Sequence, residues 1–149
     1  MLIRHDRALL ALDIMLDVAF HAGRGVVVTG AAEIAERLGM ARRGIEPALQ
    51  ALVRAGLLES LRGPRGGYRL GRAPRAITLL EAAMANREED AATTDATGLL
   101  STAVIQPLWQ ELDASLRVRL GALTLHDLLQ RASAKGLRRP VTEPLNFAI

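Results

Sequence analysis

The segment Leu57–Leu70 reads LLESLRGPRGGYRL, two short runs of mixed apolar and polar residues joined by Gly-Pro-Arg-Gly-Gly. Glycine and proline in the connection predict a β-hairpin, because these residues adopt the backbone conformations that tight turns require. A hairpin needs only a pair of turn residues, yet this connection is cationic, with Arg62 at its start and Arg65 at its tip. The segments that precede the hairpin indicate what such a tip could contact.

Three segments with helical periodicity precede the hairpin. The first, 8–23, predicts an amphipathic helix that Gly23 ends. We expect its apolar face to comprise residues spaced three and four apart, namely Leu9, Leu12, Leu16 and Ala19. Asp13 and Asp17 are expected on the opposite face, and a short β-prone run, 26–29, follows.

The second and third helical segments are short and adjacent. The second is expected to begin at the capping pair Thr29-Gly30 and to stop at Gly39. The third follows a turn at 40–41, ends at Gly56 and carries one apolar face, namely Ile45, Leu49, Leu52 and Val53. Two short helices joined by a tight glycine-containing turn form a helix-turn-helix, whose second helix can enter the DNA major groove. The hairpin is then a wing, and residues 1–85 are predicted to form a winged helix-turn-helix domain.

The charges of the chain are unevenly distributed. The net charge is only +3, but residues 37–75 hold nine arginines against two glutamates, a balance of +7. Residues 77–100 hold one arginine against five acidic residues, a balance of −4. A basic block inside a patterned motif indicates a polyanionic partner, although a charge run can also be an ordinary solvated surface.

Two capping boxes mark helices beyond the hairpin. Thr78–Glu81 opens a helix to about Arg87, and Thr124–Asp127 opens a last helix that ends near Gly136. Residues 86–98 are polar and acidic and predict a flexible loop. Between them, 99–120 predicts a long helix that Pro107 starts or kinks. The helix carries an apolar row, with Trp109 beside it, namely Val104, Leu108, Leu112, Leu116 and Leu120.

The strings LVRAGLLESLRGPRGGYRLGRAP (52–74), ITLLEA (77–82) and PLWQEL…LTLHDLL (107–129) together resemble the Rrf2 family of bacterial transcription regulators. The wing string is the most specific part, and MLD at 15–17 and IAERLG at 34–39 support it. The resemblance covers roughly 2–85 and 106–131. It implies a mainly α fold with a small β wing, a loop at 86–103, dimerisation helices at 104–136 and a tail at 137–149. It also implies a homodimer that binds an imperfect palindrome.

Many members of that family hold an iron–sulfur cluster through three closely spaced cysteines in the loop after the fourth helix. This chain contains no cysteine, and its equivalent loop, 86–106, contains no histidine either. Iron–sulfur centres depend on thiolate ligands, so we expect neither a cluster nor any other cofactor. The absence of cysteine also excludes disulfides, thiolate catalysis and ordinary zinc fingers.

The hairpin tip suits the minor groove of DNA, which is only about 6 Å wide. Three glycines are expected to keep the tip slender, namely Gly63, Gly66 and Gly67, and Pro64 stiffens it. Arg62 and Arg65 supply the charge that narrow grooves attract, and Arg62 matches the wing arginine that the resemblance implies. Tyr68 is expected either to brace the wing or to contact phosphate. The alternative is a plain surface turn.

Base contacts are expected from the start of the third helix. Arg42 and Arg43 can each donate two hydrogen bonds to guanine, and Glu46 can accept one from cytosine. Alternatively, the arginines contact phosphate only. Pro47 is best tolerated in the first turn of a helix, so it predicts a helix start near 44–46.

Further phosphate contacts are expected from Arg4, Arg7 and the helix start near Thr29, although Arg4 and Arg7 are equally compatible with solvated surface. If a dimer neutralises about eight phosphates, the slope of log K against log salt is near −7.

The apolar row of the long helix could form a monomer core, but a helix set apart from the amino-terminal domain favours pairing with a second copy. We therefore expect a cytoplasmic, homodimeric transcriptional repressor that binds double-stranded DNA at a palindromic operator. No membrane partner is expected. Two alternatives are a regulator that senses an effector through 86–106 or the dimer groove, and a winged-helix module that binds protein instead of DNA. The sequence offers no convincing catalytic set, so an enzyme is not expected.

Overall fold

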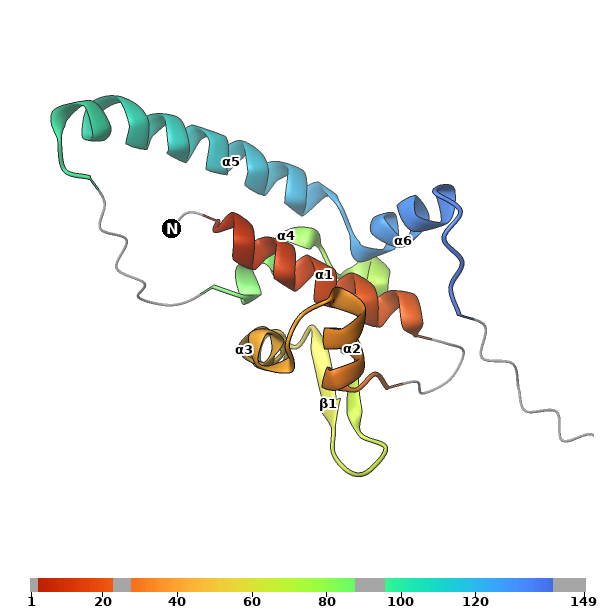
Figure 1. The fold of residues 1–149 in the computed structure, drawn as a ribbon. Coiled ribbons are helices and arrows are strands. Elements are labelled where there is room, and N and C mark those ends of the chain that lie inside the picture. Colours follow the sequence, from red (N-terminus) through yellow and green to blue (C-terminus); the bar gives the residue numbers. More distant parts are fainter. Residues whose placement is uncertain (1–2, 23–27, 88–95, 141–149) are drawn as a thin grey trace, which may run out of the picture.

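The computed structural model describes residues 3–22, 28–87 and 96–140. Its elements are α1 (His5–His21), α2 (Ala31–Leu38), α3 (Arg42–Arg54), β1 (Leu58–Leu61), β2 (Gly67–Leu70), a 3₁₀ turn (Pro74–Ala76), α4 (Leu79–Ala85), a π-helical turn (Ser101–Ile105), α5 (Gln106–Ala122) and α6 (Leu125–Ala134). The predicted fold class, mainly helical with a small β wing, is confirmed (Figure 1). The predicted end of the first helix at Gly23, half of the run at 26–29 and most of the loop at 86–98 lie outside the described residues.

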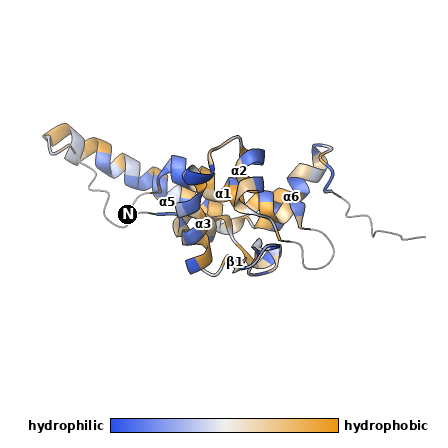
Figure 2. Ribbon diagram, turned by 60° about the horizontal axis from the view of Figure 1, so that its bottom comes forward, coloured by the Kyte–Doolittle hydropathy of each residue, from blue (hydrophilic) through white to orange (hydrophobic). Residues whose placement is uncertain are grey.

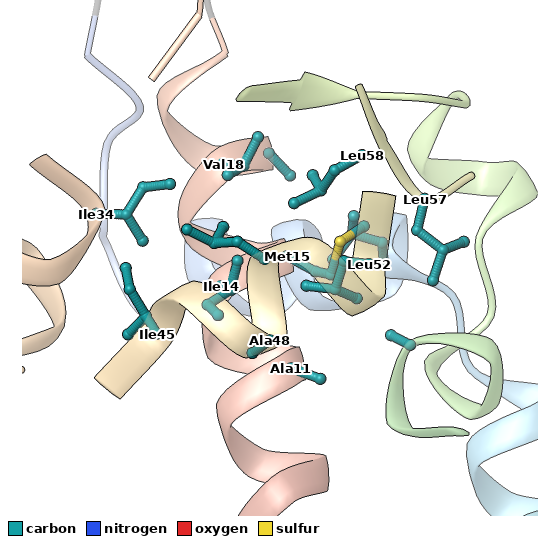
Figure 3. Packing of buried hydrophobic residues seen from close by; sticks show 14 of the residues in the cluster. Ala11, Ile14, Met15, Val18, Ile34, Ile45, Ala48, Leu52, Leu57 and Leu58 are labelled. Atoms are coloured by element: carbon teal, nitrogen blue, oxygen red, sulfur yellow. The ribbon is translucent and has the colours of Figure 1, made fainter. Parts of the chain in front are cut away.

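Helix α1 is the centre of the domain, because it contacts α2, α3, α4, α6 and β2. Its buried apolar residues are mainly Ala11, Ile14, Met15, Val18 and Ala19, which pack against α3 and β1 (Figure 3). The predicted apolar face is therefore wrong at Leu9, which is 47% exposed, whereas Leu12 and Leu16 are half-buried and Ala19 is buried. A helix packed on several sides lacks the single stripe that the periodicity assumes.

The helix-turn-helix is formed as predicted by α2 and α3. Gly39 ends α2 with a φ of 66°, and the backbone N–H groups of Gly39 and Met40 donate to carbonyls of the last turn. The predicted start of α3 near 44–46 is wrong, because the helix begins at Arg42 and Pro47 lies inside it. Pro47 cannot donate to the carbonyl of Arg43 four residues earlier. The burial of Ile45, Leu49 and Leu52 against the core fixes the helix nevertheless.

The wing is an antiparallel hairpin in which Leu58 pairs with Leu70 and Leu61 with Gly67. Thr29 extends it, since the backbones of Thr29 and Tyr68 exchange hydrogen bonds of 2.9 and 2.8 Å. The wing glycines have different roles. Gly63 adopts a φ of 114° in the turn, whereas a Cβ atom at Gly67 would lie 2.6 Å from the carbonyl oxygen of Thr29. Gly67 is thus required for the docking of the wing on the domain.

Both predicted capping boxes are present, and they lie side by side. Thr78 and Thr124 form an isolated β-bridge, so the starts of α4 and α6 are joined through their backbones. Pro107 lies in the first turn of α5, directly after the π-helical turn. A proline crowds the carbonyl four residues earlier, here that of Ala103, and the wider π turn gives it room.

Helix α5 extends away from the amino-terminal domain, on the side opposite the wing (Figure 1). None of its residues is buried. At the other end of the chain, Arg139 donates hydrogen bonds to the carbonyls of Ala19, Phe20 and Ala22, so it caps the last turn of α1. None of the helices in the described ranges combines the length and the apolar character needed to cross a bilayer.

Candidate nucleic-acid interface

The first turn of α3 presents two exposed arginines, as the sequence predicts. The Nε atom of Arg42 lies 3.2 Å from Oε1 of Glu46, one turn along the helix. Glu46 is therefore already engaged, and a cytosine would have to compete with Arg42 for it. Arg43 is exposed, and it forms no ion pair with any residue that the structure describes. Arg43 is thus the freer of the two donors.

The turn of the wing presents Arg62 and Arg65. Both are exposed, and neither has an ion-pair partner within the described ranges. Arg69, by contrast, lies directly opposite Glu59 in the hairpin, with Nε 2.7 Å from Oε2. Tyr68 is half-buried and packs against the core, so of its two predicted roles the structure favours bracing the wing.

The predicted phosphate contacts fall in three different environments. Thr29 is only 4% exposed, and the N-cap of α2 is Gly30, so the hydroxyl of Thr29 is not at the surface. Arg4 is exposed at the start of α1, 3.5 Å from Asp6. Arg7 is half-buried beside α3 and lines a cavity there. The geometry supports a surface role for Arg4 only.

The +7 balance of the basic block overstates its available charge. Four of its nine arginines form ion pairs, namely Arg37 with Asp17, Arg42 with Glu46, Arg69 with Glu59 and Arg72 with Glu81. The remaining five arginines are exposed without an ion pair in the described part of the chain, namely Arg43, Arg54, Arg62, Arg65 and Arg75. Three of these five, Arg43, Arg62 and Arg65, lie in the first turn of α3 and in the turn of the wing.

A partly buried ion pair that sequence reasoning missed joins α1 to α2. Asp17 is 9% exposed and accepts from Nε and Nη2 of Arg37, at 2.9 and 2.8 Å. The hydrogen bond to Asp17 raises the pKa of Arg37, whereas burial opposes the shift. Asp17 had been expected opposite the apolar face, and only the packing of α2 on α1 brings its partner within reach.

The predicted dimerisation residues lie on α5 and the turn before it. Val104, Leu108, Trp109, Leu112 and Leu116 are exposed, whereas Leu120 is half-buried. Four further exposed apolar residues were not predicted, namely Leu99, Leu100, Ile105 and Val118. Figure 2 shows hydrophobic colouring at the protruding end of this helix. Contiguous exposed apolar surface of this kind is typical of an interaction site.

The middle of α5 is fixed to the amino-terminal segment through Asp113. This carboxylate accepts a hydrogen bond of 2.6 Å from the backbone N–H of Ile3 and another of 2.6 Å from Nε of Arg117. Burial alone would raise the pKa of Asp113, but these hydrogen bonds outweigh it and lower the pKa. The orientation of α5 is therefore linked to the start of α1.

In the comparison with known proteins, the matching family model and the similar curated proteins are all described as transcriptional regulators. The family model named Rrf2, described as an iron-dependent transcriptional regulator, matches residues 5–131. The HTH-type transcriptional regulator IscR of Vibrio cholerae is 33% identical over 123 residues, which cover 80% of this chain and 70% of that protein. IscR of Aliivibrio salmonicida is 46% identical over 69 residues, 46% of this chain but only 40% of that protein.

Two solved structures share the fold. IscR of T. potens superimposes with a TM-score of 0.69 and 27% identity, over 92% of this chain and 93% of that one. CymR, the global cysteine regulator of B. subtilis, superimposes with a TM-score of 0.66 and 26% identity, over 88% and 98%.

The donor set of this chain does not fit an iron–sulfur cluster. The sequence has no cysteine, and cluster iron is held by cysteine thiolates. Among the residues that the structure describes, no group of three or more His, Asp or Glu side chains is placed to hold a metal ion.

Proposed function

The chain belongs to the Rrf2 family of transcriptional regulators, and from this premise we propose that it is a repressor that binds a palindromic operator as a homodimer. The observation that carries the proposal is the pair of exposed arginines, Arg62 and Arg65, which have no ion-pair partner among the described residues and lie at the tip of a hairpin hydrogen-bonded to the helix-turn-helix. The reciprocal backbone hydrogen bonds between Thr29 and Tyr68 fix the wing to the residue before the N-cap of α2.

In the proposed complex, α3 enters the major groove and the wing enters the adjacent minor groove. Arg43 donates to base edges, with guanine as the preferred partner, and Arg42 contacts a base or phosphate at the expense of its bond to Glu46. Arg62 and Arg65 provide positive charge where the minor groove is narrow. Arg4 adds a phosphate contact. We do not assign a contact to the hydroxyl of Thr29, because it is buried.

The proposed dimer forms through α5. Its apolar row is too exposed to be a monomer core, since Leu112 is 51% and Trp109 57% exposed. A second copy related by two-fold symmetry would cover the same row with its own. Such a dimer presents two recognition helices, so the operator should be palindromic with half-sites separated by whole helical turns.

We also propose that the protein works without an iron–sulfur cluster, since its chain offers no thiolate. The absorption spectrum and iron content of anaerobically purified protein test this proposal. A visible chromophore with stoichiometric iron would contradict it.

The test of DNA recognition is selection of bound genomic fragments with the purified protein, followed by footprinting. We expect the enriched fragments to share one two-fold symmetric sequence that overlaps promoters. Enrichment of no sequence over random DNA, even at low salt, would contradict the proposal. An operator that does not overlap a promoter would contradict repression alone.

A further inference from the structure

A cavity of about 440 Å³ lies between α1 and α3, directly behind the start of the recognition helix. Its volume is within the range of small-molecule sites. Leu9 and Leu10 form its apolar wall on α1, and Met40 and Pro47 form the wall on the other side. Leu9 and Met40 are 47% and 41% exposed. A ligand that covers these two side chains would remove apolar surface from water.

Two carboxylates line the cavity, and one of them has no partner among the residues that the structure describes. Asp6 and Asp13 lie two turns apart on α1 and both line the cavity. Asp6 is within 3.5 Å of Arg4, whereas Asp13 makes no hydrogen bond or ion pair with any described residue. Asp13 is exposed to solvent, but the partial burial of its carboxyl raises its pKa, and no hydrogen bond or ion pair from the described residues compensates for that burial. A cation beside it would supply that compensation.

The side chains of Asn86 and Arg7, which also line the cavity, have interactions of their own. The side-chain amide of Asn86 donates to the backbone carbonyl of Arg7 at 3.0 Å, which closes the cavity near the end of α4. Arg7 also lines the cavity and contacts neighbouring groups. An anion-binding role would therefore have to work against two aspartates.

We propose that this cavity binds a small organic cation, a primary amine with an apolar body. Its ammonium group donates to Asp13, and its hydrocarbon part lies against Leu9, Leu10 and Met40. Because Gly44 and Pro47 of α3 also line the cavity, an occupant contacts both α1 and the start of the recognition helix. Amine binding is independent of the proposed function, whereas its effect on DNA affinity rests on it.

The test measures binding by calorimetry, with hexylamine as the probe and with hexanol and hexanoate as its neutral and anionic counterparts. We expect saturable binding of hexylamine and binding at least about tenfold weaker for the other two, the factor for one charge-assisted hydrogen bond. Asp13→Asn should weaken hexylamine about tenfold for the same reason. Glu36→Gln, on the exposed face of α2, removes an equal charge elsewhere and should have no effect.

A second variant tests the cavity by filling it. A Cβ atom at Gly44 meets only Met40, at 3.5 Å, so a side chain fits there without a backbone clash. Leucine also favours helix over glycine, so Gly44→Leu should fold normally and abolish hexylamine binding. Equal affinity for hexylamine and hexanol, or unchanged affinity in Asp13→Asn or Gly44→Leu, would overturn the assignment.

The regulatory effect is measured on the operator fragment. Saturating hexylamine should change the DNA affinity of the wild-type protein at least threefold and that of Asp13→Asn not at all. An unchanged wild-type affinity would refute the coupling between cavity and DNA. Failure of every variant to bind DNA would refute the proposed function, while calorimetry would still decide amine binding.

Discussion

Replacing both wing arginines with alanine should lower the salt dependence of DNA binding by a calculable amount. Arg62 and Arg65 are exposed and have no ion pair in the described part of the chain, so each can neutralise one phosphate. The proposed dimer carries two copies of each, and every phosphate contact contributes about 0.9 to the slope of log K against log salt. Loss of all of them should therefore reduce the slope by about 3.6. That is half of the value near −7 expected for about eight contacts.

The assay is fluorescence anisotropy of a labelled operator duplex, titrated at several salt concentrations. The matched control is Glu59→Ala/Arg69→Ala, which also replaces two residues of the hairpin. Because Arg69 and Glu59 form an ion pair at 2.7 Å, their removal should leave the slope unchanged within about 1. An equal decrease in both variants, or no decrease in the first, would refute the assignment of the wing as a cationic probe.

Three further outcomes are expected. Leu112→Asp should convert the dimer to monomer in sedimentation, whereas Ala114→Asp, which is exposed and lies about 160° around α5 from Leu112, should not. Asp17→Asn should lower the free energy of unfolding in urea by about 2 kcal/mol, between the values for exposed and buried pairs, because it leaves Arg37 without its main partner. Glu81→Gln should destabilise the protein at neutral pH but not in acid. The backbone hydrogen bond from Thr78 and the bond from Arg72 lower the pKa of Glu81 below its ordinary 4.5. This stabilisation is therefore present above that value and lost as the pH falls through the folded-state pKa.

Each of these predictions has a control variant or a result that would contradict it. Glu33 also lies near Arg37, at 3.7 Å, but its side chain is 66% exposed, so Glu33→Gln should cost less than about 0.5 kcal/mol. If Glu33→Gln lowers the free energy of unfolding as much as Asp17→Asn does, burial does not explain the contribution of the Asp17–Arg37 pair to stability. If the wild-type protein sediments as a monomer, the proposal that α5 forms a dimer interface is wrong. A Glu81→Gln effect that persists in acid would mean that the substitution acts through packing.

The local features of the fold could be predicted from the sequence, because short-range backbone chemistry determines them. Gly39 ends α2, Thr78 and Thr124 open their helices, and the Gly-Pro-Arg-Gly-Gly turn makes the wing. The buried face of α1 could not be predicted in the same way. Its neighbours come from segments distant in the chain, so Ala11 is buried while the larger Leu9 is 47% exposed.

The exposed arginines of the candidate site could be predicted from the sequence, but the long-range ion pair that holds its helices together could not. Arg43, Arg62 and Arg65 are exposed where the motif places them. The pairing of Arg42 with Glu46 follows helical spacing and could have been expected. The pairing of Arg37 with Asp17 could not, because it depends on how α2 packs against α1.

The contacts of α1 imply that a signal can reach both proposed DNA-contacting elements, the wing and α3, through this helix. Asp17 of α1 holds α2 through Arg37, and residues of β2 and α3 contact the same helix. A displacement of α1 must therefore move the wing and the recognition helix together, because packed interiors transmit strain rather than absorb it. A chain without thiolates cannot use a cluster to produce that displacement, whereas an occupant of the cavity between α1 and α3 would act on the same contact directly. The cavity and the ion pair involve different carboxylates of α1, Asp13 and Asp17, which lie one turn apart on the same face. Asp13→Asn should therefore remove a ligand response without lowering stability. Asp17→Asn should do the reverse. If the two variants behaved alike, the view of α1 as the shared support would fail.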